Sequence, residues 1–170
     1  MNALVLGGTR FVGRHLVERL LREGVAVTLL HTGNQDPFGA RVEHVETDRR
    51  DHDAVAKALN GRRFTWVFDH AYIQPSGTTP TMVEHMLKLV GEHARRYVFT
   101  SSVAVYDVGT ARLETDPTAT RGDPYSVHKI GCEAALNTWA EATGGATAIL
   151  RPASILGPFN RGYQLRFFWD

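Results

Sequence analysis

Apolar runs alternate with amphipathic stretches along the whole chain. Six short runs rich in aliphatic and β-branched residues have the length and composition of buried strands, namely 3–6, 25–30, 42–46, 64–68, 97–100 and 147–150. Apolar residues recur at helical spacing in the segments 11–23, 51–59, 79–93 and 125–142. Because strands and helices take turns, the sequence predicts an α/β fold of the Rossmann type, a doubly wound parallel sheet of six strands with helices on both faces.

Composition places the chain among ordinary globular proteins. It has 170 residues, enough for one domain with a sizeable core, and no apolar run long enough to span a membrane. Cys132 is its single cysteine and no signal peptide is evident, so we expect a cytoplasmic protein without an internal disulfide. The net charge of +1 gives no reason to expect nucleic acid or a membrane as a partner. The eight histidines show no metal-binding spacing, so we expect no metal site.

A glycine-rich turn lies between the first predicted strand and the first predicted helix. It consists of Gly7, Gly8, Thr9, Arg10, Phe11, Val12 and Gly13. Gly7 would let the chain turn tightly, Gly8 would remove a side chain near a pyrophosphate, and Gly13 would let the helix pack closely on the strand. The free N–H groups of the helix start would bind the phosphates. The turn therefore predicts a dinucleotide site; the alternative is a turn used only for packing.

Tyr125 and Lys129 form a YxxxK pair at the start of the last predicted helix. Side chains at i and i+4 lie on one face of a helix, so both can reach the same substrate and cofactor. A tyrosine has an ordinary pKa of about 10, and a nearby ammonium favours the phenolate and lowers that pKa. Tyr125 would then donate or accept a proton near neutral pH.

Four motifs follow one another along the chain. They are GGTRFVG at 7–13, SSVAVY at 101–106, YSVHK at 125–129 and RPASILGP at 151–158. Together they resemble the extended branch of the short-chain dehydrogenase/reductase family, the NAD-dependent epimerase/dehydratase-like group, in the subset with a GGTRFxG turn. The resemblance implies that Ser102, Tyr125 and Lys129 are catalytic, and that Lys129 also binds the nicotinamide ribose.

The same resemblance assigns residues around the cofactor. It places Asp48 at the adenine amine and the backbone near Pro152 and Ile155 along the nicotinamide. His31, Arg49 and Ala71 complete the predicted cofactor contacts. The alternative for Asp48 is an ordinary residue at a helix start.

The end of the second predicted strand bears on the choice between NAD and NADP. An acid there would bind the ribose 2′-hydroxyl and select NAD, but the chain runs into His31-Thr32-Gly33-Asn34. Arg10 could pair with a 2′-phosphate. We therefore favour NADP over NAD; the alternative is that Arg10 faces solvent and His31 contacts the adenosine ribose.

Two segments depart from the family pattern. Val103 and Ala104 replace the Asp-Glu pair that some sugar-nucleotide dehydratases carry after the catalytic serine or threonine, which argues against water elimination. The segment 67–72, VFDHAY, differs from the usual VxHxAA. Asp69 and His70 are either extra polar groups near the cofactor or residues that simply end a strand.

These features favour an NAD(P)-dependent oxidoreductase or epimerase that transfers a hydride between nicotinamide and a carbinol carbon, with a nucleotide-sugar as the small-molecule substrate. The alternatives are a non-catalytic NAD(P)-binding sensor or scaffold, and an RNA-binding relative that shares the GGTRFxG turn. Residues 1–158 are predicted to be the NAD(P)-binding domain, and 159–170 the start of a substrate region that is mostly absent. A homodimer would form through the helices at 79–93 and 125–142.

Overall fold

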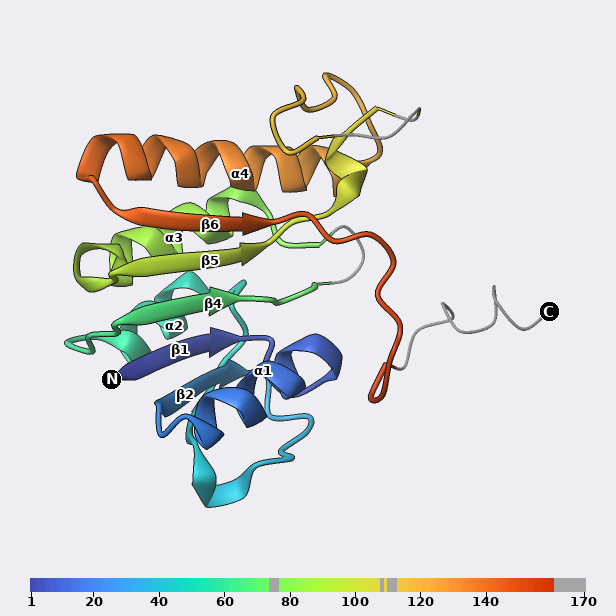
Figure 1. Ribbon diagram of the computed structural model, residues 1–170. Coiled ribbons are helices and arrows are strands. Elements are labelled where there is room, and N and C mark those ends of the chain that lie inside the picture. The colour runs from blue at the N-terminus through green and yellow to red at the C-terminus, as the bar shows by residue number, and fades with distance from the viewer. Residues whose placement is uncertain (74–76, 108, 110–112, 161–170) are drawn as a thin grey trace.

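The computed structural model describes residues 1–73, 77–107, 109 and 113–160 (Figure 1). These residues form one sheet of six parallel strands in the order β3-β2-β1-β4-β5-β6. The strands are β1 (Asn2–Leu6), β2 (Ala26–His31), β3 (Glu43–Glu46), β4 (Trp66–Asp69), β5 (Arg96–Thr100) and β6 (Ala146–Leu150). The α-helices are α1 (Phe11–Arg22), α2 (His52–Leu59), α3 (Pro80–Val90) and α4 (Pro124–Thr143). The predicted doubly wound sheet is confirmed, and most of the expected substrate region, 161–170, lies outside the described residues.

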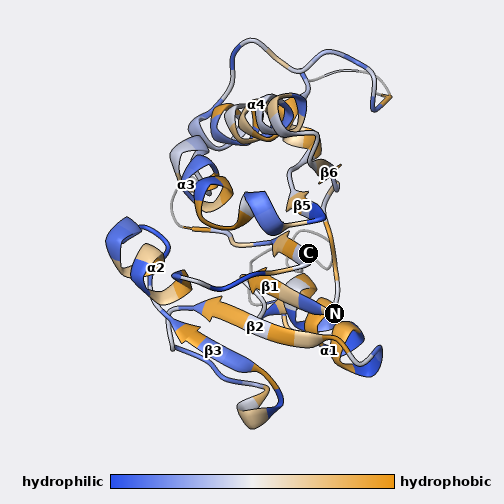
Figure 2. Ribbon diagram, turned by 90° about the vertical axis from the view of Figure 1, so that its left-hand side faces the viewer, coloured by the Kyte–Doolittle hydropathy of each residue, from blue (hydrophilic) through white to orange (hydrophobic). Residues whose placement is uncertain are grey.

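The helices form two layers against the sheet (Figures 1 and 2). On one face α1 packs over β1 and β2, where Val17 meets Val5 and Leu29. On the other face α2, α3 and α4 cover a larger apolar cluster that contains Tyr97. The strand order reverses between β1 and β4. A ligand crevice is therefore expected at the carboxyl ends of these two strands.

Helix starts differ in one respect that bears on ligand binding. Asp51, Thr79 and Asp123 are the N-caps of α2, α3 and α4, and each side chain accepts a hydrogen bond from a backbone N–H of the first turn. Arg10 precedes α1 and makes no such bond. Within the described residues, the first N–H groups of α1 thus lack the capping side chain that the other three helices have. No helix in the described ranges is long and apolar enough to cross a membrane.

β4 begins later than the apolar run 64–68 predicts. Phe64 is buried in the core but precedes the strand. The side chain of Asn2 holds this segment, because its amide donates to the carbonyl of Arg63 at 2.6 Å and its oxygen accepts from the N–H of Thr65 at 3.0 Å. The apolar run therefore marks a buried segment, while a contact with β1 decides where the strand starts.

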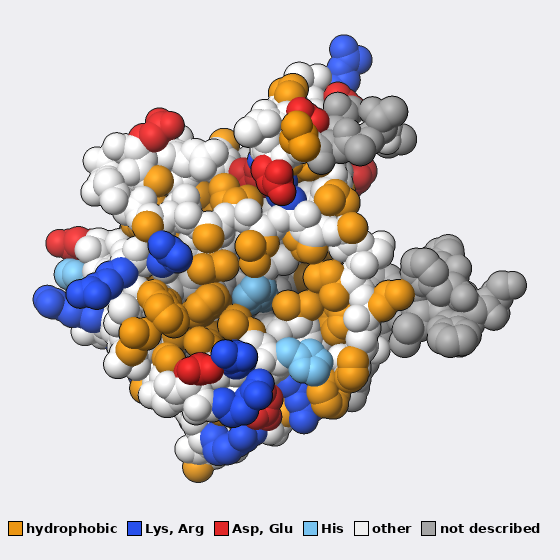
Figure 3. Space-filling view, viewed as in Figure 1, with side chains coloured by type: hydrophobic (Ala, Val, Ile, Leu, Met, Phe, Trp, Pro, Cys, Tyr) orange, Lys and Arg blue, Asp and Glu red, His pale blue; other side chains and the backbone are white. Residues whose placement is uncertain are grey.

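Half of the α1-side face has no helix over it in the part of the chain that the structure describes. In the parallel register Phe68, Val98 and Ala148 lie side by side, and Leu150 follows on the same side of β6. Phe68 is only partly buried, and Leu150 is 48% exposed. Figure 3 views this face and shows hydrophobic side chains gathered over it. These strands therefore keep an apolar surface open on this side.

Candidate functional site

A cleft of about 1760 Å³ runs along the carboxyl ends of the strands, from the end of β2 across the start of α1 to the segment after β6. Parallel strands explain why distant residues meet there, because their carboxyl ends share one edge of the sheet. Except for Gly8, all the residues that the sequence assigns to cofactor and catalysis line this cleft: Gly7, Thr9, Arg10, Phe11, Val12, Gly13, His31, Asp48, Arg49, Ala71, Ser102, Tyr125, Lys129, Pro152 and Ile155.

The glycine turn joins β1 to α1 with very little space around it. Gly7 has a φ of +79°, and a Cβ there would lie 2.7 Å from the Cα of Ala71. A Cβ on Gly13 would lie 2.1 Å from the carbonyl oxygen of Gly7. Neither position accepts a side chain, so α1 begins directly against the turn. The tight turn and the close helix packing expected of these two glycines are both present.

Gly8 faces the core, so the role expected for it is wrong. A Cβ on Gly8 would lie 2.3 Å from Cδ2 of Leu29 and 2.9 Å from Cγ2 of Val17. Both are core side chains, on β2 and α1. Gly8 therefore allows α1 to pack on the sheet and clears no space for a pyrophosphate.

The first turn of α1 is open to an anion. Its first N–H groups have no partner inside the helix, and Arg10 provides no cap. Phe11 has a φ of +42°, a strained conformation for a bulky residue and one that tends to occur at functional sites. Together with the positive end of the helix dipole, these N–H groups can hold the diphosphate of a dinucleotide.

The ring of His31, at the end of β2, has both nitrogens engaged. Nδ1 accepts a hydrogen bond from the N–H of Gly33 at 3.1 Å, and Nε2 lies 2.8 Å from Nδ1 of His44. Burial, and then the proximity of His44, lower the pKa of His31. A neutral ring bonded in this way has no nitrogen left for an adenosine ribose. His31 therefore shapes this end of the cleft without offering a ring nitrogen to the cofactor.

Two arginines lie at the end of the cleft that the loops after β2 and β3 form. Nε of Arg10 donates to Oε1 of Gln35, in the loop after β2, at 3.0 Å. Nη2 of Arg50 lies 2.5 Å from Oδ2 of Asp48. The side-chain hydrogen bond from Arg50 lowers the pKa of Asp48. Asp48 is thus paired with its neighbour, while Arg10 places a guanidinium where the loop after β2 meets the glycine turn.

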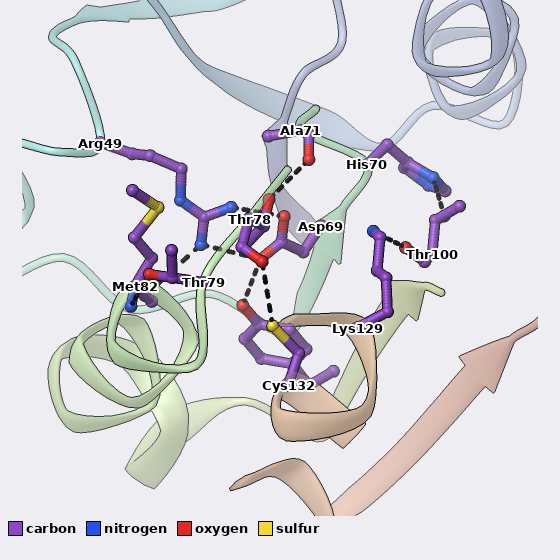
Figure 4. Close-up of polar contacts among 11 residues, drawn as sticks. Arg49, Asp69, His70, Ala71, Thr78, Thr79, Met82, Thr100, Lys129 and Cys132 are labelled. Carbon is purple, nitrogen blue, oxygen red and sulfur yellow. Dashed lines mark hydrogen bonds and ion pairs between the residues drawn. The ribbon is translucent and has the colours of Figure 1, made fainter. Parts of the chain in front are cut away.

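The guanidinium of Arg49 is buried against Asp69 (Figure 4). Nη1 and Nη2 donate to the two carboxylate oxygens of Asp69 at 2.7 and 2.9 Å. The hydroxyl of Tyr97 donates to the same carboxylate at 2.8 Å. This network ties the segment after β3 to the end of β4 and to Tyr97 of β5. The charge of Arg49 therefore balances that of Asp69, while the residue itself lines the cleft, and its contact with a cofactor stays a prediction.

Tyr125 stands at the start of α4, where the helix cap sets its position. Oδ1 of Asp123 accepts the N–H of Tyr125 at 2.8 Å. The phenol ring lies 5.7 Å from the ring of Tyr72, and a Cβ on Gly77 would lie 3.1 Å from it. Ser102 lines the same cleft as Tyr125 and lowers the pKa of its phenol. The structure thus brings these two predicted catalytic residues together, and packs the segment before α3 against the phenol.

Lys129 is buried one turn further along α4. Its Nζ donates to the carbonyl oxygen of Thr100 at 2.5 Å and lies 5.7 Å from the centre of the Tyr125 ring. Burial lowers the pKa of Lys129, and the negative charge of Asp69 partly offsets this effect. The four-residue spacing places Lys129 beside Tyr125, as the motif predicts.

Burial raises the pKa of Tyr125, which is the opposite of the lowering expected from a neighbouring ammonium. Ser102 lowers this pKa without outweighing burial. Tyr125 therefore rests as the protonated phenol.

Sequence reasoning missed the side chains that bind Arg151, which lines the cleft. Arg151 donates from Nε and Nη2 to the carboxylate of Glu133, on α4, at 3.1 and 2.6 Å. Its Nη1 donates to the hydroxyl of Tyr106, in the loop after β5. The motif at 151–158 drew attention to Arg151, but its partners stand 18 and 45 positions away. No local spacing could have identified them.

The cleft contains polar groups that suit a bound dinucleotide. Among the described residues, the buried Nε2 of His70 and the buried Oγ of Ser101 have no hydrogen-bond partner, and both residues line the cleft. Buried polar atoms are normally paired, so these two point to a bound group. The open first turn of α1 adds donors suited to phosphate.

The sheet, the glycine turn and the cleft together define a dinucleotide-binding domain of the short-chain dehydrogenase/reductase type. Residues 3–166 match the profile described as the NAD dependent epimerase/dehydratase family. The chain belongs to that family.

Several known proteins are similar to this chain. The chloroplast stem-loop binding protein of 41 kDa b from Arabidopsis thaliana is 30% identical, over 92% of this chain and 43% of that protein. A UDP-glucose 4-epimerase from Streptomyces lividans is 28% identical, over 95% of this chain and 54% of that protein. Among solved structures, Pal from Bacillus thuringiensis has a TM-score of 0.83 at 24% identity, over 95% of this chain and 58% of that one. The chain thus spans about half the length of these relatives.

Proposed function

We propose that this chain forms the cofactor-binding and proton-transferring half of an NAD(P)-dependent epimerase or reductase. The observation that carries the proposal is that Ser102, Tyr125 and Lys129 line the same cleft as the open start of α1. The reaction would move a hydride between nicotinamide and a carbinol carbon, and a proton to or from the hydroxyl on that carbon. Membership of an NAD-dependent family supports the cofactor class.

The side chains divide this chemistry among them. The bound nicotinamide supplies the hydride acceptor or donor. Tyr125 rests as a phenol, so it can give its proton to a carbonyl oxygen that is being reduced. In the reverse direction a phenolate must form, and Lys129 provides the nearby positive charge that favours it. Ser102 would hold the substrate oxygen by a hydrogen bond while its charge changes.

A nucleotide-sugar is the substrate class that we propose. The relative from Streptomyces lividans is a UDP-glucose 4-epimerase, which supports this class. Val103 and Ala104 follow Ser102 where some dehydratases carry an acid pair. We therefore favour oxidation–reduction or epimerisation over water elimination, which needs an additional acid and base.

NADP is the cofactor that we favour, because of Arg10. Its guanidinium lies beside the loop after β2, where His31 has no ring nitrogen left for a 2′-hydroxyl. Arg10→Ala should weaken NADPH binding by about tenfold or more, since a charge-assisted hydrogen bond is lost. Binding of NADH, which has no 2′-phosphate, should change by less than about threefold. Calorimetric titrations measure both affinities, and equal losses for the two cofactors would contradict the assignment.

Tyr125→Phe tests the proton-transfer step. The variant removes only the hydroxyl, so NADPH should still bind while turnover of the nucleotide-sugar falls by about 10²- to 10⁴-fold. Turnover is followed by cofactor absorbance, and binding by calorimetry. Normal turnover of Tyr125→Phe would remove this residue as the acid and base. If the unsubstituted protein binds neither NADPH nor NADH below millimolar concentrations, the proposed function fails altogether.

Nucleic-acid binding is a second candidate, because the Arabidopsis relative is named for binding a stem-loop. The net charge of +1 and the Ser102–Tyr125–Lys129 set favour the oxidoreductase. A stem-loop RNA titrated with and without NADPH separates the two candidates. Tight RNA binding without any cofactor binding would favour the second. Tight NADPH binding without turnover of any nucleotide-sugar would instead indicate a sensor or scaffold.

A further inference from the structure

His70 lines the cleft beside the glycine turn. It follows β4 directly, and its N–H donates to the carbonyl oxygen of Leu6, at the end of β1, at 3.0 Å. A Cβ on Gly7 would lie 2.9 Å from the carbonyl carbon of His70, so this residue abuts the glycine turn. The imidazole stacks on Phe68 with 6.3 Å between the ring centres. His70 therefore lies between the turn that would hold phosphates and the end of β5.

The two ring nitrogens of His70 differ, because only one of them is hydrogen bonded within the described part of the chain. Nδ1 hydrogen bonds with the hydroxyl of Thr100, on β5 (Figure 4). Nε2 is buried and has no partner among the described residues. A buried polar atom without a partner carries an energetic penalty that a ligand can remove. This nitrogen is thus a contact left open in the cleft.

The partner at Nδ1 leaves the protonation state of the ring adjustable. The hydroxyl of Thr100 can either donate or accept, because it carries one proton and two lone pairs. When it donates to Nδ1 of a neutral His70, the ring proton is on Nε2 and is available to a ligand. When the ring is protonated, Nδ1 donates to the hydroxyl and Nε2 still carries a proton. His70 can therefore gain a proton without losing Thr100.

Burial, more than the surrounding charges, favours the neutral form of His70 in the free protein. Burial lowers its pKa most strongly, and Lys129, reaching in from α4, lowers it further. Asp69, the preceding residue of β4, raises it, but the net pKa lies below the ordinary value. Tyr125, the other titratable side chain of α4 in the cleft, is also neutral. An anion bound at Nε2 would raise the pKa of His70.

We propose that His70 is a further cofactor-binding residue, whose Nε2–H donates a hydrogen bond to the diphosphate of the bound dinucleotide. The proposal rests on the proposed function, and it adds a group that the family pattern does not provide, since this segment departs from VxHxAA. The diphosphate is the part of the cofactor that the open start of α1 and the glycine turn would hold. The backbone of His70 abuts that turn, and its side chain lines the same cleft. Binding would then be accompanied by uptake of a proton on His70.

Calorimetric titration of ADP-ribose, which carries the diphosphate but no nicotinamide, tests this proposal. Titrations in two buffers of different ionisation enthalpy give the number of protons taken up. His70→Gln keeps an amide N–H near the position of Nε2 but cannot titrate. His70→Asn keeps a polar group near Thr100 and does not reach the ligand. His93→Gln, at an exposed position near the opposite edge of the sheet, is the matched control.

The unsubstituted protein and His93→Gln should bind ADP-ribose more tightly as the pH falls from about 8 to 6, with at most about a tenfold gain per pH unit for one proton. His70→Gln should bind about as well at pH 8, with no proton uptake and a flat pH profile. His70→Asn should bind about tenfold or more weakly. Proton uptake that persists in His70→Gln, or unchanged binding by His70→Asn, would overturn the proposal. If the unsubstituted protein binds no dinucleotide, the proposed function fails and this proposal fails with it.

Discussion

At the scale of single residues, Arg49 and Asp69 show how burial decides a role. Their side chains are 3% and 0% exposed. Burial alone would raise the pKa of Asp69, but the charge and the hydrogen bonds of Arg49 outweigh it, and the pKa lies below its ordinary value. Each charge can remain in the core only because the other is present.

Removing one partner should therefore be costly. Asp69→Asn should lower the free energy of unfolding by about 3–5 kcal/mol, because it leaves the Arg49 charge buried without its counterion. Glu43→Gln is the matched control, since Glu43 pairs with Arg62 on the surface and its loss should cost less than about 1 kcal/mol. Urea unfolding measures both values. Equal losses of unfolding free energy in the two variants would mean that the buried pair stabilises the fold no more than the surface pair does.

The same ion pair predicts a loss of stability in acid. The folded-state pKa of Asp69 lies below its unfolded value of about 3.9, so its contribution is complete above that pH and is lost as the pH falls through the folded-state pKa. Between about pH 5 and 3 the unsubstituted protein should lose more stability than Asp69→Asn. Thermal melts across this range provide the comparison. Parallel pH profiles for the two proteins would show that Asp69 is not responsible.

At the scale of elements, the junction between β1 and α1 is the part most sensitive to a single methyl group. Gly13→Ala should abolish NADPH binding, because the new Cβ would lie 2.1 Å from the carbonyl oxygen of Gly7 and push α1 off the turn. Gly24→Ala is the matched control, since Gly24 has a φ of +71° and open space around it. The backbone strain in Gly24→Ala should cost about 1–2 kcal/mol of stability without weakening NADPH binding. Calorimetry together with circular dichroism separates lost binding from lost folding.

The start of α4 links a helix cap to the proposed chemistry. Asp123 accepts the N–H of Tyr125 at 2.8 Å and the hydroxyl of Ser126 at 2.7 Å. Asp123→Ala should lower turnover several-fold more than it lowers NADPH affinity, because the first helical turn that carries Tyr125 would loosen. Asp123→Asn keeps an acceptor and should restore most of the turnover. If the two variants were equally impaired, the cap would not be what positions Tyr125.

At the scale of the whole molecule, the sheet face of β4 to β6 and the groove between α3 and α4 suit different partners. The α1-side face of β4 to β6 keeps Phe68 partly buried and Leu150 48% exposed. A groove of about 960 Å³ between α3 and α4 is lined by small residues such as Gly131 and Ala134. The second surface consists of the helices from which the sequence predicts a homodimer. The exposed sheet face of β4 to β6 is apolar and suits a different apolar partner.

Two variants separate these surfaces. We propose that the helices form the homodimer, so Ala134→Arg should give a monomer because a long charged side chain would enter the contact. Leu150→Lys should keep the dimer and reduce aggregation at high concentration, because it places a charge on the open sheet face. Light scattering after size exclusion measures both effects. A dimer that survives Ala134→Arg but not Leu150→Lys would assign the interface to the sheet.

The sequence by itself determined the elements, their order and the residues that meet at the carboxyl edge of the sheet. Hydrophobic periodicity is a local property. It therefore predicts most ends of the strands and helices to within a few residues. Alternation of strands and helices implies parallel strands, whose carboxyl ends share one edge. For this reason the sequence alone assigns segments as far apart as 7–13 and 125–129 to a single cleft.

Only the tertiary structure decided where individual side chains point and what charge they carry. Gly8 faces the core, Arg49 binds Asp69 from 20 positions away, and burial raises the pKa of Tyr125. One ring nitrogen of His70 bonds with Thr100, 30 positions later, and the other has no partner among the residues that the structure describes. Contacts between distant residues and the loss of water around them leave no periodic signal in the sequence, so these properties emerge only when the strands are packed together.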